Sequence, residues 1–396
     1  MKAPRLFPLF LLASLPAWAE VNLLYHVDVQ LQPDSRVQEM TRDILLEDDT
    51  DVAHNRVRQL EYHPEWQQVS LLEAYTVLPD GRRVPVPATA VADQPYSQSQ
   101  DNPYTQSMRS LDVTFPQAQK GARVVYRFRT ASQLLALQAR QGDFYPASVK
   151  NPRLVRFTLT APHSLGLKVA ANSAVAEQRL ADGRVQWQAQ WQLAGDGTQP
   201  VPHLAYSAYR DWSALGQAYA QLWPQPQPSA AIKDKAAQLV AASNGDRLKE
   251  MQALYQWVAE LPAQHLAYSS HALQPRAAEQ VMAQGYGNSR DKVALLQALL
   301  AARGIDSYPQ LARRQGRALP LLPTSLAFDC VLLHVPAQGG MRAQWLDPAE
   351  RISAGAEAIL SAVADATPLP LGAGFSAALL GSPQLPLRAP YDPRLF

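Results

Sequence analysis

One short proline-spaced segment divides the chain into two regions with different periodicities. Within residues 222–228, every second position from Pro224 to Pro228 is proline, a composition typical of a stiff, extended linker. Before this segment apolar residues tend to alternate with polar ones, as they do in strands, and after it they recur at helical spacing. We therefore expect two domains, because 396 residues with 47% hydrophobic content suffice to bury a core in each.

The region before the linker, residues 20–221, has the pattern of β-structure. Short runs with apolar residues at alternate positions are separated by turn sequences such as Pro79-Asp80-Gly81. Regularly spaced strands with one buried face predict a β-sandwich. The polar stretch 92–110 is expected to form a long surface loop that interrupts the sheet. The alternating runs are Val27/Val29/Leu31, Val69/Leu71, Val124/Tyr126/Phe128, Val155/Phe157/Leu159 and Val185/Trp187.

Four helices are predicted after the linker. Ser229 and Asp246 stand where they can cap the first two helices. A third helix is expected to start at Pro275, a residue favoured at the first helical position. A fourth follows the glycine-containing turn 285–289 and ends at Gly304, a residue typical of helix C-termini.

Strands are predicted at 307–312, 328–335 and 343–346, where apolar and β-branched residues cluster. Helices followed by an antiparallel sheet indicate an α+β domain, which we assign to residues 229–370. The prolines of residues 371–396 indicate a loop-rich C-terminal tail.

The N-terminus has the layout of a secretory signal peptide. Lys2 and Arg5 precede an apolar stretch at 6–15, and Ala17-Trp18-Ala19 forms a small-x-small cleavage site before Glu20. The apolar stretch is too short to span a bilayer, and no later segment reaches the roughly 18 unbroken apolar residues of a transmembrane helix. Residues 1–19 are therefore expected to be removed after Ala19, which predicts a periplasmic protein.

Charge and cysteine content limit the classes of ligand. Loss of residues 1–19 removes two of the 36 basic residues and none of the 34 acidic ones, which leaves a mature chain of zero formal charge. Such a chain, with its charges scattered, is not expected to bind nucleic acid. The one cysteine, Cys330, cannot form an internal disulfide or a cysteine-based zinc site. We expect no metal and no cofactor.

The run Gly285-Tyr286-Gly287-Asn288-Ser289-Arg290-Asp291-Lys292 is the segment with the clearest chemical meaning. A glycine-containing turn that enters a helix sets residue 289 at the helix N-terminus, where backbone N–H groups and the helix dipole favour negative charge. A cysteine at that position would have a lowered thiol pKa and could attack a carbonyl carbon.

This run resembles the nucleophile segment of bacterial transglutaminase-like proteins, which usually reads Gly-Tyr-Gly-Asp-Cys-Lys-Asp-Lys. Phe328-Asp329-Cys330-Val331 resembles the family segment that carries the catalytic histidine, and Trp345-Leu346-Asp347-Pro348 the one that carries the aspartate. Residues 62–66 and 73–82 resemble the β-rich domain of unknown function that often precedes this fold in exported proteins. The resemblance implies a β-sandwich followed by a papain-like, transglutaminase-type α+β domain.

The same resemblance argues against the family's reaction. Ser289 stands where the family has cysteine, and Cys330 stands where it has histidine, so only Asp347 of the three triad positions matches. A serine hydroxyl needs an adjacent general base, and a thiol cannot shuttle protons as an imidazole does. Without a histidine to orient, Asp347 is expected to cap a turn before Pro348. Asp291 and Lys292 are expected to serve helix electrostatics and solvation.

Other histidines could replace the missing base. His334 lies on the same predicted strand as Cys330 and on the same face, but roughly 13 Å away. His265 and His271 precede the third helix. For each, a structural or surface role is the simpler interpretation. Cys330 as an alternative nucleophile also lacks an evident base, and thiols on strands are usually inert core groups.

We therefore expect a non-catalytic, degenerate transglutaminase-like envelope protein. A cleft near Tyr286, Gly287, Asn288 and Ser289 would bind a peptide, a peptidoglycan fragment or an envelope protein. One alternative is an altered hydrolase or acyltransferase that uses Ser289 as nucleophile. Another is that the β-sandwich is the functional module, in structure or assembly, and the C-terminal half supports it.

Overall fold

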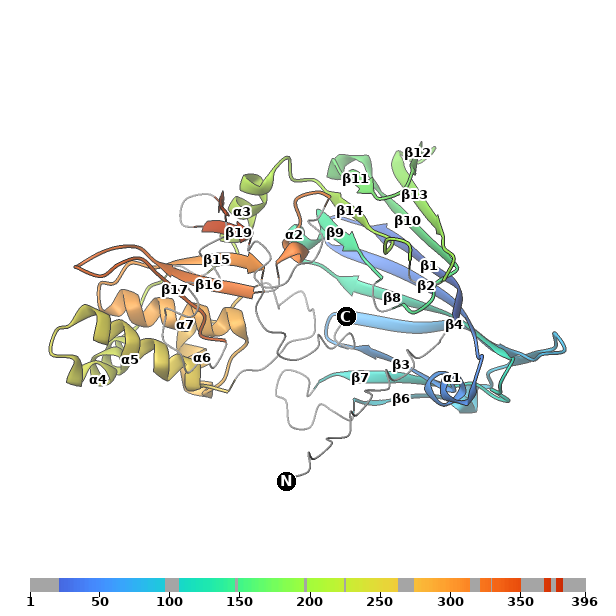
Figure 1. Cartoon of the computed structure of the whole chain (residues 1–396), viewed down its shortest axis with the longest axis horizontal. Coiled ribbons are helices and arrows are strands. Elements are labelled where there is room, and N and C mark those ends of the chain that lie inside the picture. Colours follow the sequence, from blue (N-terminus) through green and yellow to red (C-terminus); the bar gives the residue numbers. More distant parts are fainter. Residues whose placement is uncertain are drawn as a thin grey trace, which may run out of the picture.

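The computed structural model describes residues 21–96, 107–146, 149–195, 198–223, 226–262, 274–313, 321–328, 330–349, 367–371 and 375–379 (Figure 1). The predicted signal peptide at 1–19 lies outside these ranges, as do residues 97–106 of the predicted surface loop. The described residues form a β-rich part and a part in which helices pack on a second sheet (Figure 1). The predicted α+β class is confirmed.

The β-rich part is built on an eight-stranded sheet with the strand order β12-β13-β10-β1-β2-β8-β4-β5. Strands β1 and β10 are parallel, and the other neighbouring pairs are antiparallel. The strands are β1 (Val21–Leu31), β2 (Ser35–Leu45), β4 (Gln67–Val77), β5 (Arg83–Pro85), β8 (Arg123–Gln133), β10 (Leu154–Pro162), β12 (Val175–Arg179) and β13 (Arg184–Gln192).

Two three-stranded sheets cover one face of this large sheet, with orders β11-β14-β9 and β3-β7-β6. Val27, Met40 and Phe128 are paired across β1, β2 and β8 and therefore share a face. Val27 belongs to one hydrophobic core, Phe128 to the other, and Met40 packs against both. The predicted β-sandwich is thus confirmed, with its second layer divided in two. The strands are β3 (Val57–Tyr62), β6 (Val91–Pro95), β7 (Arg109–Thr114), β9 (Gln141–Phe144), β11 (Lys168–Ala171) and β14 (Leu204–Ser207).

The predicted surface loop at 92–110 is wrong at both ends, because β6 and β7 lie there and pair with each other. Val91 of β6 is opposite Val113 of β7, and both pack in the hydrophobic core that contains Phe128. Burial of these valines outweighs the polar composition around them. The short helices of this part are α1 (Asp49–Asn55), η1 (Ala88–Ala90), α2 (Ala136–Ala139) and η3 (His163–Leu165).

The four predicted helices after the linker are present as α4 (Ala230–Leu239), α5 (Arg247–Glu260), α6 (Ala278–Gln284) and α7 (Ser289–Ala302). The Ser229 side chain accepts a hydrogen bond from the Ile232 amide, and Asp246 caps α5 in the same way. Helix α6 begins three residues after Pro275, because the Arg276 amide is held by a side chain of α7, Asp291. A short 3-10 turn, η4 (Ala241–Ser243), separates α4 from α5.

The second sheet has the order β17-β16-β15-β19-β18. It is mixed, whereas the sequence predicted an antiparallel sheet, because β19 pairs with β15 in parallel. Strand β19 also lies inside the predicted loop-rich tail, so that prediction is wrong for Phe375–Leu379, where pairing to β15 fixes an extended backbone. The elements are β15 (Tyr308–Arg313), η6 (Ser325–Ala327), β16 (Cys330–Val335), β17 (Gln344–Leu346), β18 (Thr367–Leu371) and β19 (Phe375–Leu379).

Helix α7 is the central element of the C-terminal core. All its residues from Asp291 to Leu300 are buried, and one apolar cluster joins them to α4, α5 and the sheet. The sheet contributes alternate residues of its strands to that cluster, as expected when one face is covered. These residues are Leu311, Val331, Leu333, Val335 and Leu346.

The predicted boundary at residues 221–222 does not coincide with a change of core. Helix α3 (Trp212–Ala220) belongs by its buried side chains to the C-terminal core, to which it contributes Leu215 and Tyr219. Trp223, in the predicted linker, is buried too, and its indole N–H donates to Gln297 of α7 at 2.9 Å. Large aromatic burial at both positions outweighs the spacer-like composition of the segment.

A buried polar contact joins the two parts of the chain. Gln141 of β9 donates to the Ser325 hydroxyl at 2.7 Å and accepts from the Ser325 amide at 2.6 Å. The Ser207 hydroxyl of β14 donates to the Pro323 carbonyl at 2.6 Å. The three-stranded sheet β11-β14-β9 is therefore hydrogen-bonded to the segment that leads into β16.

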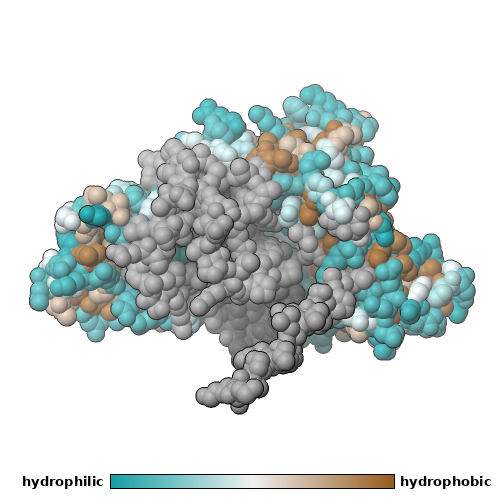
Figure 2. Space-filling model, viewed as in Figure 1, coloured by the Kyte–Doolittle hydropathy of each residue, from teal (hydrophilic) through white to brown (hydrophobic). Residues whose placement is uncertain are grey.

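The coloured part of the molecular surface is mainly hydrophilic in the view of Figure 2, and hydrophobic residues form only small groups there. Among the residues that the structure describes, no helix has the length and apolarity needed to cross a membrane.

Candidate functional site

The turn between α6 and α7 holds residue 289 at a helix N-terminus, as the sequence predicted. Gly285 ends α6 in a left-handed conformation with φ of 74°, which glycine adopts without strain. Asn288 caps α7, and its side-chain oxygen accepts hydrogen bonds from the amides of Arg290 (2.8 Å) and Asp291 (3.0 Å). Ser289 is the first residue of α7 and is partly buried.

Asp291 fastens the turn from inside. Its buried carboxylate accepts hydrogen bonds from the Arg276 amide (2.8 Å), the Arg276 Nε (3.0 Å) and the Asn288 amide (3.2 Å). Arg276 also donates to the Tyr286 carbonyl at 2.9 Å and lies 4.9 Å from the centre of the Tyr286 ring. Because its charge is held by this arginine, Asp291 serves to fix the turn and is not available as a general base for Ser289.

Glycine at position 287 allows the turn to pack closely against the first turn of α7. A Cβ atom at this position would lie 2.9 Å from the Cβ of Asp291 and 3.2 Å from a methyl of Val281. Any other residue would therefore push the turn away from the first turn of α7.

Lys292 joins the N-terminal end of α7 to the C-terminal end of α5. It is fully buried, and its Nζ donates to the carbonyls of Ala259 (3.1 Å) and Leu261 (2.9 Å). A positive charge stabilises the unsatisfied carbonyls of a helix C-terminus. The expectation of a solvation role for Lys292 and Asp291 is therefore wrong, because neither side chain reaches solvent.

Of the other two predicted site positions, Cys330 begins β16 and Asp347 directly follows the neighbouring strand β17. Leu346 of β17 is paired with Leu333 of β16, and Asp347 follows directly. One further step of this register sets Asp347 opposite Leu332, two positions from Cys330.

Asp347 has the turn-capping contact that the sequence predicted. It is 3% exposed, and its Oδ1 accepts a hydrogen bond from the Ala349 amide at 3.0 Å. Its backbone carbonyl accepts from the hydroxyl of Tyr255 in α5, also at 3.0 Å.

Of the three histidines considered as alternative bases, the structure describes only His334. His334 is paired with Tyr308 and Trp345 on the neighbouring strands, and its ring lies 4.6 Å from that of Trp345. Burial lowers the pKa of His334, so its imidazole is neutral at neutral pH. His265 and His271 lie outside the described residues.

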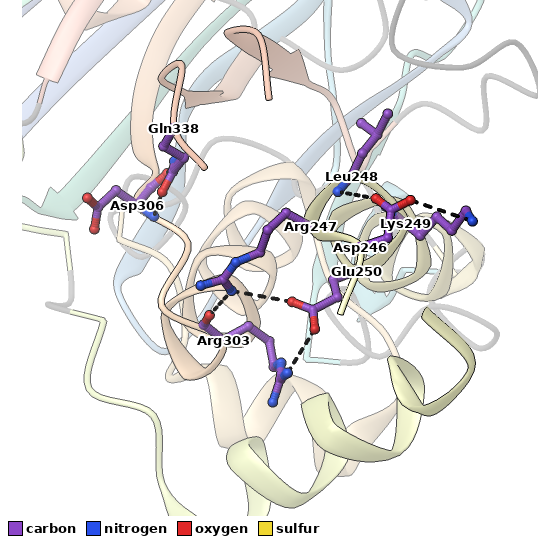
Figure 3. Close-up of polar contacts among 8 residues, drawn as sticks. All are labelled: Asp246, Arg247, Leu248, Lys249, Glu250, Arg303, Asp306 and Gln338. Atoms are coloured by element: carbon purple, nitrogen blue, oxygen red, sulfur yellow. Dashed lines mark hydrogen bonds and ion pairs between the residues drawn. The ribbon is translucent and has the colours of Figure 1, made fainter. Parts of the chain in front are cut away.

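A second ionic cluster lies at the opposite ends of α5 and α7 (Figure 3). Glu250, buried near the start of α5, contacts Arg247 at 3.4 Å and Arg303, just beyond α7, at 2.8 Å. Arg247 also donates to the Arg303 carbonyl. Nearby, the side chain of Gln338 bonds both the amide and the carbonyl of Asp306. Helix α7 is thus held to α5 by charged groups at both ends.

Arg276, Tyr255 and the partners of Lys292 are the residues that sequence reasoning missed. The Asn288-x-x-Asp291 spacing of a capping box was a local signal that the turn is structural. The other contacts join segments far apart in sequence and had no local signal. In the described part of the chain, no three histidine, cysteine, aspartate or glutamate side chains cluster closely enough to hold a metal ion.

Comparison with known families identifies part of the β-rich region. Residues 37–194 match the model of DUF3857, a domain of unknown function. The resemblance of residues 62–66 and 73–82 to a β-rich domain of unknown function is confirmed by this match. No curated protein matches the chain.

Comparison with solved structures shows the fold of both regions together. A candidate protease from Parabacteroides distasonis superposes with a TM-score of 0.70 at 16% identity, over 83% of this chain and 67% of that one. At this identity the similarity shows the fold alone. Two M1 zinc metallopeptidase structures, one from Deinococcus radiodurans, match with TM-scores of 0.28 and 0.29 at 12% and 11% identity. They cover 48% of this chain and 43% and 42% of their own, and carry no argument.

Proposed function

We propose that this chain is a non-catalytic binding protein of the cell envelope, built on a transglutaminase-like scaffold whose nucleophile and base positions hold Ser289 and Cys330. The proposal rests on the contacts made by the turn between α6 and α7 and by the first turn of α7. Asn288, Asp291 and Lys292 are all committed to structural contacts. The turn therefore keeps its shape without offering Ser289 a base.

The chemistry of the substituted residues supports the same conclusion. A serine hydroxyl is a much weaker acid than a thiol, so the helix N-terminus alone does not ionise it. Nucleophile and base act as a unit, and loss of both removes most of the rate enhancement. In this proposal the ligand is a peptide, a peptidoglycan fragment or an envelope protein.

A serine-reactive fluorophosphonate probe tests the proposal against the altered-hydrolase alternative. The wild-type protein and Ser289→Ala are incubated with the probe and analysed by intact mass. We expect no adduct on either protein. Stoichiometric labelling of the wild type that disappears in Ser289→Ala would overturn the non-catalytic proposal in favour of a serine hydrolase or acyltransferase.

The cellular location is a separate proposal, which rests on the signal-like N-terminus. Export would yield a periplasmic chain that begins at Glu20, after cleavage at Ala19. Intact mass of the protein recovered from a periplasmic fraction tests this. A full-length chain in the cytoplasmic fraction would contradict it.

A further inference from the structure

Two side chains of the small sheet β11-β14-β9 contact the segment that leads into β16, and they belong to one cross-strand pair. Gln141 of β9 is directly opposite Ser207 of β14 in the strand register, so both side chains lie on the same face of the sheet. Gln141 bonds the hydroxyl and the amide of Ser325, and Ser207 bonds the carbonyl of Pro323. We call Gln141 and Ser207 the docking pair.

The contact between the docking pair and the segment 323–325 is buried. Gln141 is 4% exposed, Ser207 1% and Ser325 3%. Thr324, between the two contacted residues, is fully buried. A buried donor or acceptor that loses its protein partner has no water to replace it. Removal of either member of the docking pair would therefore leave polar groups of the segment 323–325 without a partner.

The two strands that carry the docking pair are tightly joined to each other. Asp143 follows Gln141 by two positions on β9 and lies on the same face, and its carboxylate pairs with the His203 Nε2 at 2.7 Å. Both of these side chains are largely buried. Between them in β9, a Cβ atom at Gly142 would lie 2.2 Å from the ring of Tyr206, so only glycine lets β14 pack this closely. The docking pair is thus presented on a fixed support.

The C-terminal core holds the other end of the same segment. Phe328 follows η6 directly and is 1% exposed. Its ring lies edge-to-face on that of Trp212 in α3, with the ring centres 5.6 Å apart. Cys330 then begins β16 and is paired with Ala312 of β15. Because the segment is short and held at both ends, its attachment to the β-rich part limits where β16 can begin.

The docking pair is not the only contribution of the β-rich part to the C-terminal core. Leu137 of α2 is 5% exposed and belongs to the apolar cluster built around α7. Gln141 and Leu137 both lie within residues 37–194, which match DUF3857. Contacts between independently moving domains of one chain are mostly polar and resemble transient interfaces. Here a buried polar contact is combined with a shared apolar core, which indicates a fixed arrangement.

We propose that the DUF3857 domain of this chain is a positioning module for the C-terminal domain. Through the docking pair it fixes the segment 323–328, and thereby the start of β16, where position 330 of the candidate site lies. The partner of this surface is a segment of the same chain. The proposal goes beyond the proposed function and does not depend on it, because it assigns a role to the β-rich domain whether or not Ser289 reacts.

Hydrogen exchange of the full chain, measured by mass spectrometry, tests the proposal. We expect Gln141→Ala and Ser207→Ala each to speed exchange about tenfold or more in peptides that cover residues 323–335, because loss of a buried hydrogen bond favours local opening. Peptides from β2 and β8 of the large sheet should exchange as they do in the wild type. Such a local change at β16 is expected only if the docking pair holds the segment before it.

Thr76→Val is the matched control. The Thr76 hydroxyl is fully buried and donates to the Pro116 carbonyl at 2.7 Å, as the Ser207 hydroxyl does to the Pro323 carbonyl at 2.6 Å. The Thr76 contact lies entirely within the β-rich part. We therefore expect Thr76→Val to speed exchange around residues 76 and 116 and to leave residues 323–335 unchanged.

Two results would overturn the proposal. One is unchanged protection of residues 323–335 in both docking-pair variants. The other is an equal loss of protection there in Thr76→Val, which would mean that general destabilisation is the cause. Ser325→Ala breaks the Gln141 contact from the C-terminal side and gives the same reading if Gln141→Ala does not fold. Failure of the proposed function is detected separately, because the fluorophosphonate experiment depends on Ser289 alone.

Discussion

The two ends of helix α7 are built alike, although only one of them carries a candidate nucleophile. At the N-terminal end, the buried Asp291 carboxylate is held by Arg276, at 2.9 Å. At the C-terminal end, the buried Glu250 carboxylate is held by Arg247 and Arg303 (Figure 3). The cluster at the C-terminal end contains no candidate nucleophile, yet it too has a buried carboxylate paired with arginine.

Buried ion pairs at both ends of this helix therefore serve to attach it to neighbouring segments, which are the turn before α6 at the N-terminal end and α5 at the C-terminal end. Perturbed or clustered charges often mark active sites, but structural ion-pair networks give the same signal. Here the Ser289 end differs from the other in having a partly buried serine and a more deeply buried arginine.

The largest effect is expected for Asp291→Ala. This change leaves Arg276, which is 20% exposed, without its carboxylate, and leaves the Asn288 and Arg276 amides without their acceptor. Loss of one partner of a buried pair costs about 3–5 kcal/mol. Urea unfolding measures the loss of stability. Asp234→Ala, at an exposed position of α4, is the control and should change stability little.

A smaller loss is expected for Glu250→Ala at the opposite end. The arginines there are more exposed, Arg247 by 41% and Arg303 by 33%, so water can replace much of the lost contact. We expect about 1–3 kcal/mol from the same unfolding experiment. Equal losses of stability for Glu250→Ala and Asp291→Ala would contradict the conclusion that burial makes the ion pair at the N-terminal end of α7 the more important one.

Lys292→Met should cost about 1–3 kcal/mol, because the carbonyls of Ala259 and Leu261 lose a charged donor while the apolar part of the side chain is retained. Hydrogen exchange at the end of α5 locates the effect. Protection there that is unchanged in the variant would show that Lys292 does not cap this helix.

His334 gives a pH-dependent effect of smaller size. Burial lowers the folded-state pKa of His334 below its value in the unfolded chain. The unfolded state therefore binds the proton first, and this group's contribution to stability falls as the pH drops below about 6.5. Melting temperatures of wild type and His334→Gln between neutral and mildly acidic pH measure it. The wild type should lose more stability than the variant, and parallel curves would contradict the assignment.

The smallest effect is expected for Ser289→Ala. The Ser289 side chain caps nothing, since Asn288 provides the capping oxygen of α7. The free energy of unfolding should change by no more than about 0.5 kcal/mol, as it does for a surface substitution. The melting temperature should therefore be almost unchanged. Asn288→Ala is the paired change and should cost about 1 kcal/mol, because it removes the cap.

Local signals in the sequence predicted much of the fold. Ser229, Asp246 and Gly304 marked helix boundaries because caps and stops depend on adjacent residues. The parallel pairing of β19 with β15 was missed, because it joins residues more than 60 positions apart and leaves no local periodicity. Trp223 was misread for a similar reason, since its partner Gln297 is distant in sequence.

For the candidate site, the sequence predicted the position of Ser289 at a helix N-terminus and the turn role of Asp347. The roles of Asp291 and Lys292 were missed, because charged residues in a first helical turn usually face solvent, whereas here both are fully buried. Their partners, Arg276 and the end of α5, could be known only from the packing of three helices.

The thiol pKa of the Ser289→Cys/Cys330→His double variant tests whether the turn at residue 289 keeps the scaffold of a nucleophile site although its reactive groups are replaced. Cys330 is the only cysteine of the chain, so this variant has one thiol, at position 289. The pH dependence of its alkylation by iodoacetamide gives the pKa. We expect a value below the ordinary thiol pKa of about 8.5, because residue 289 lies at a helix N-terminus. A folded variant with a thiol pKa of about 8.5 or higher would contradict it.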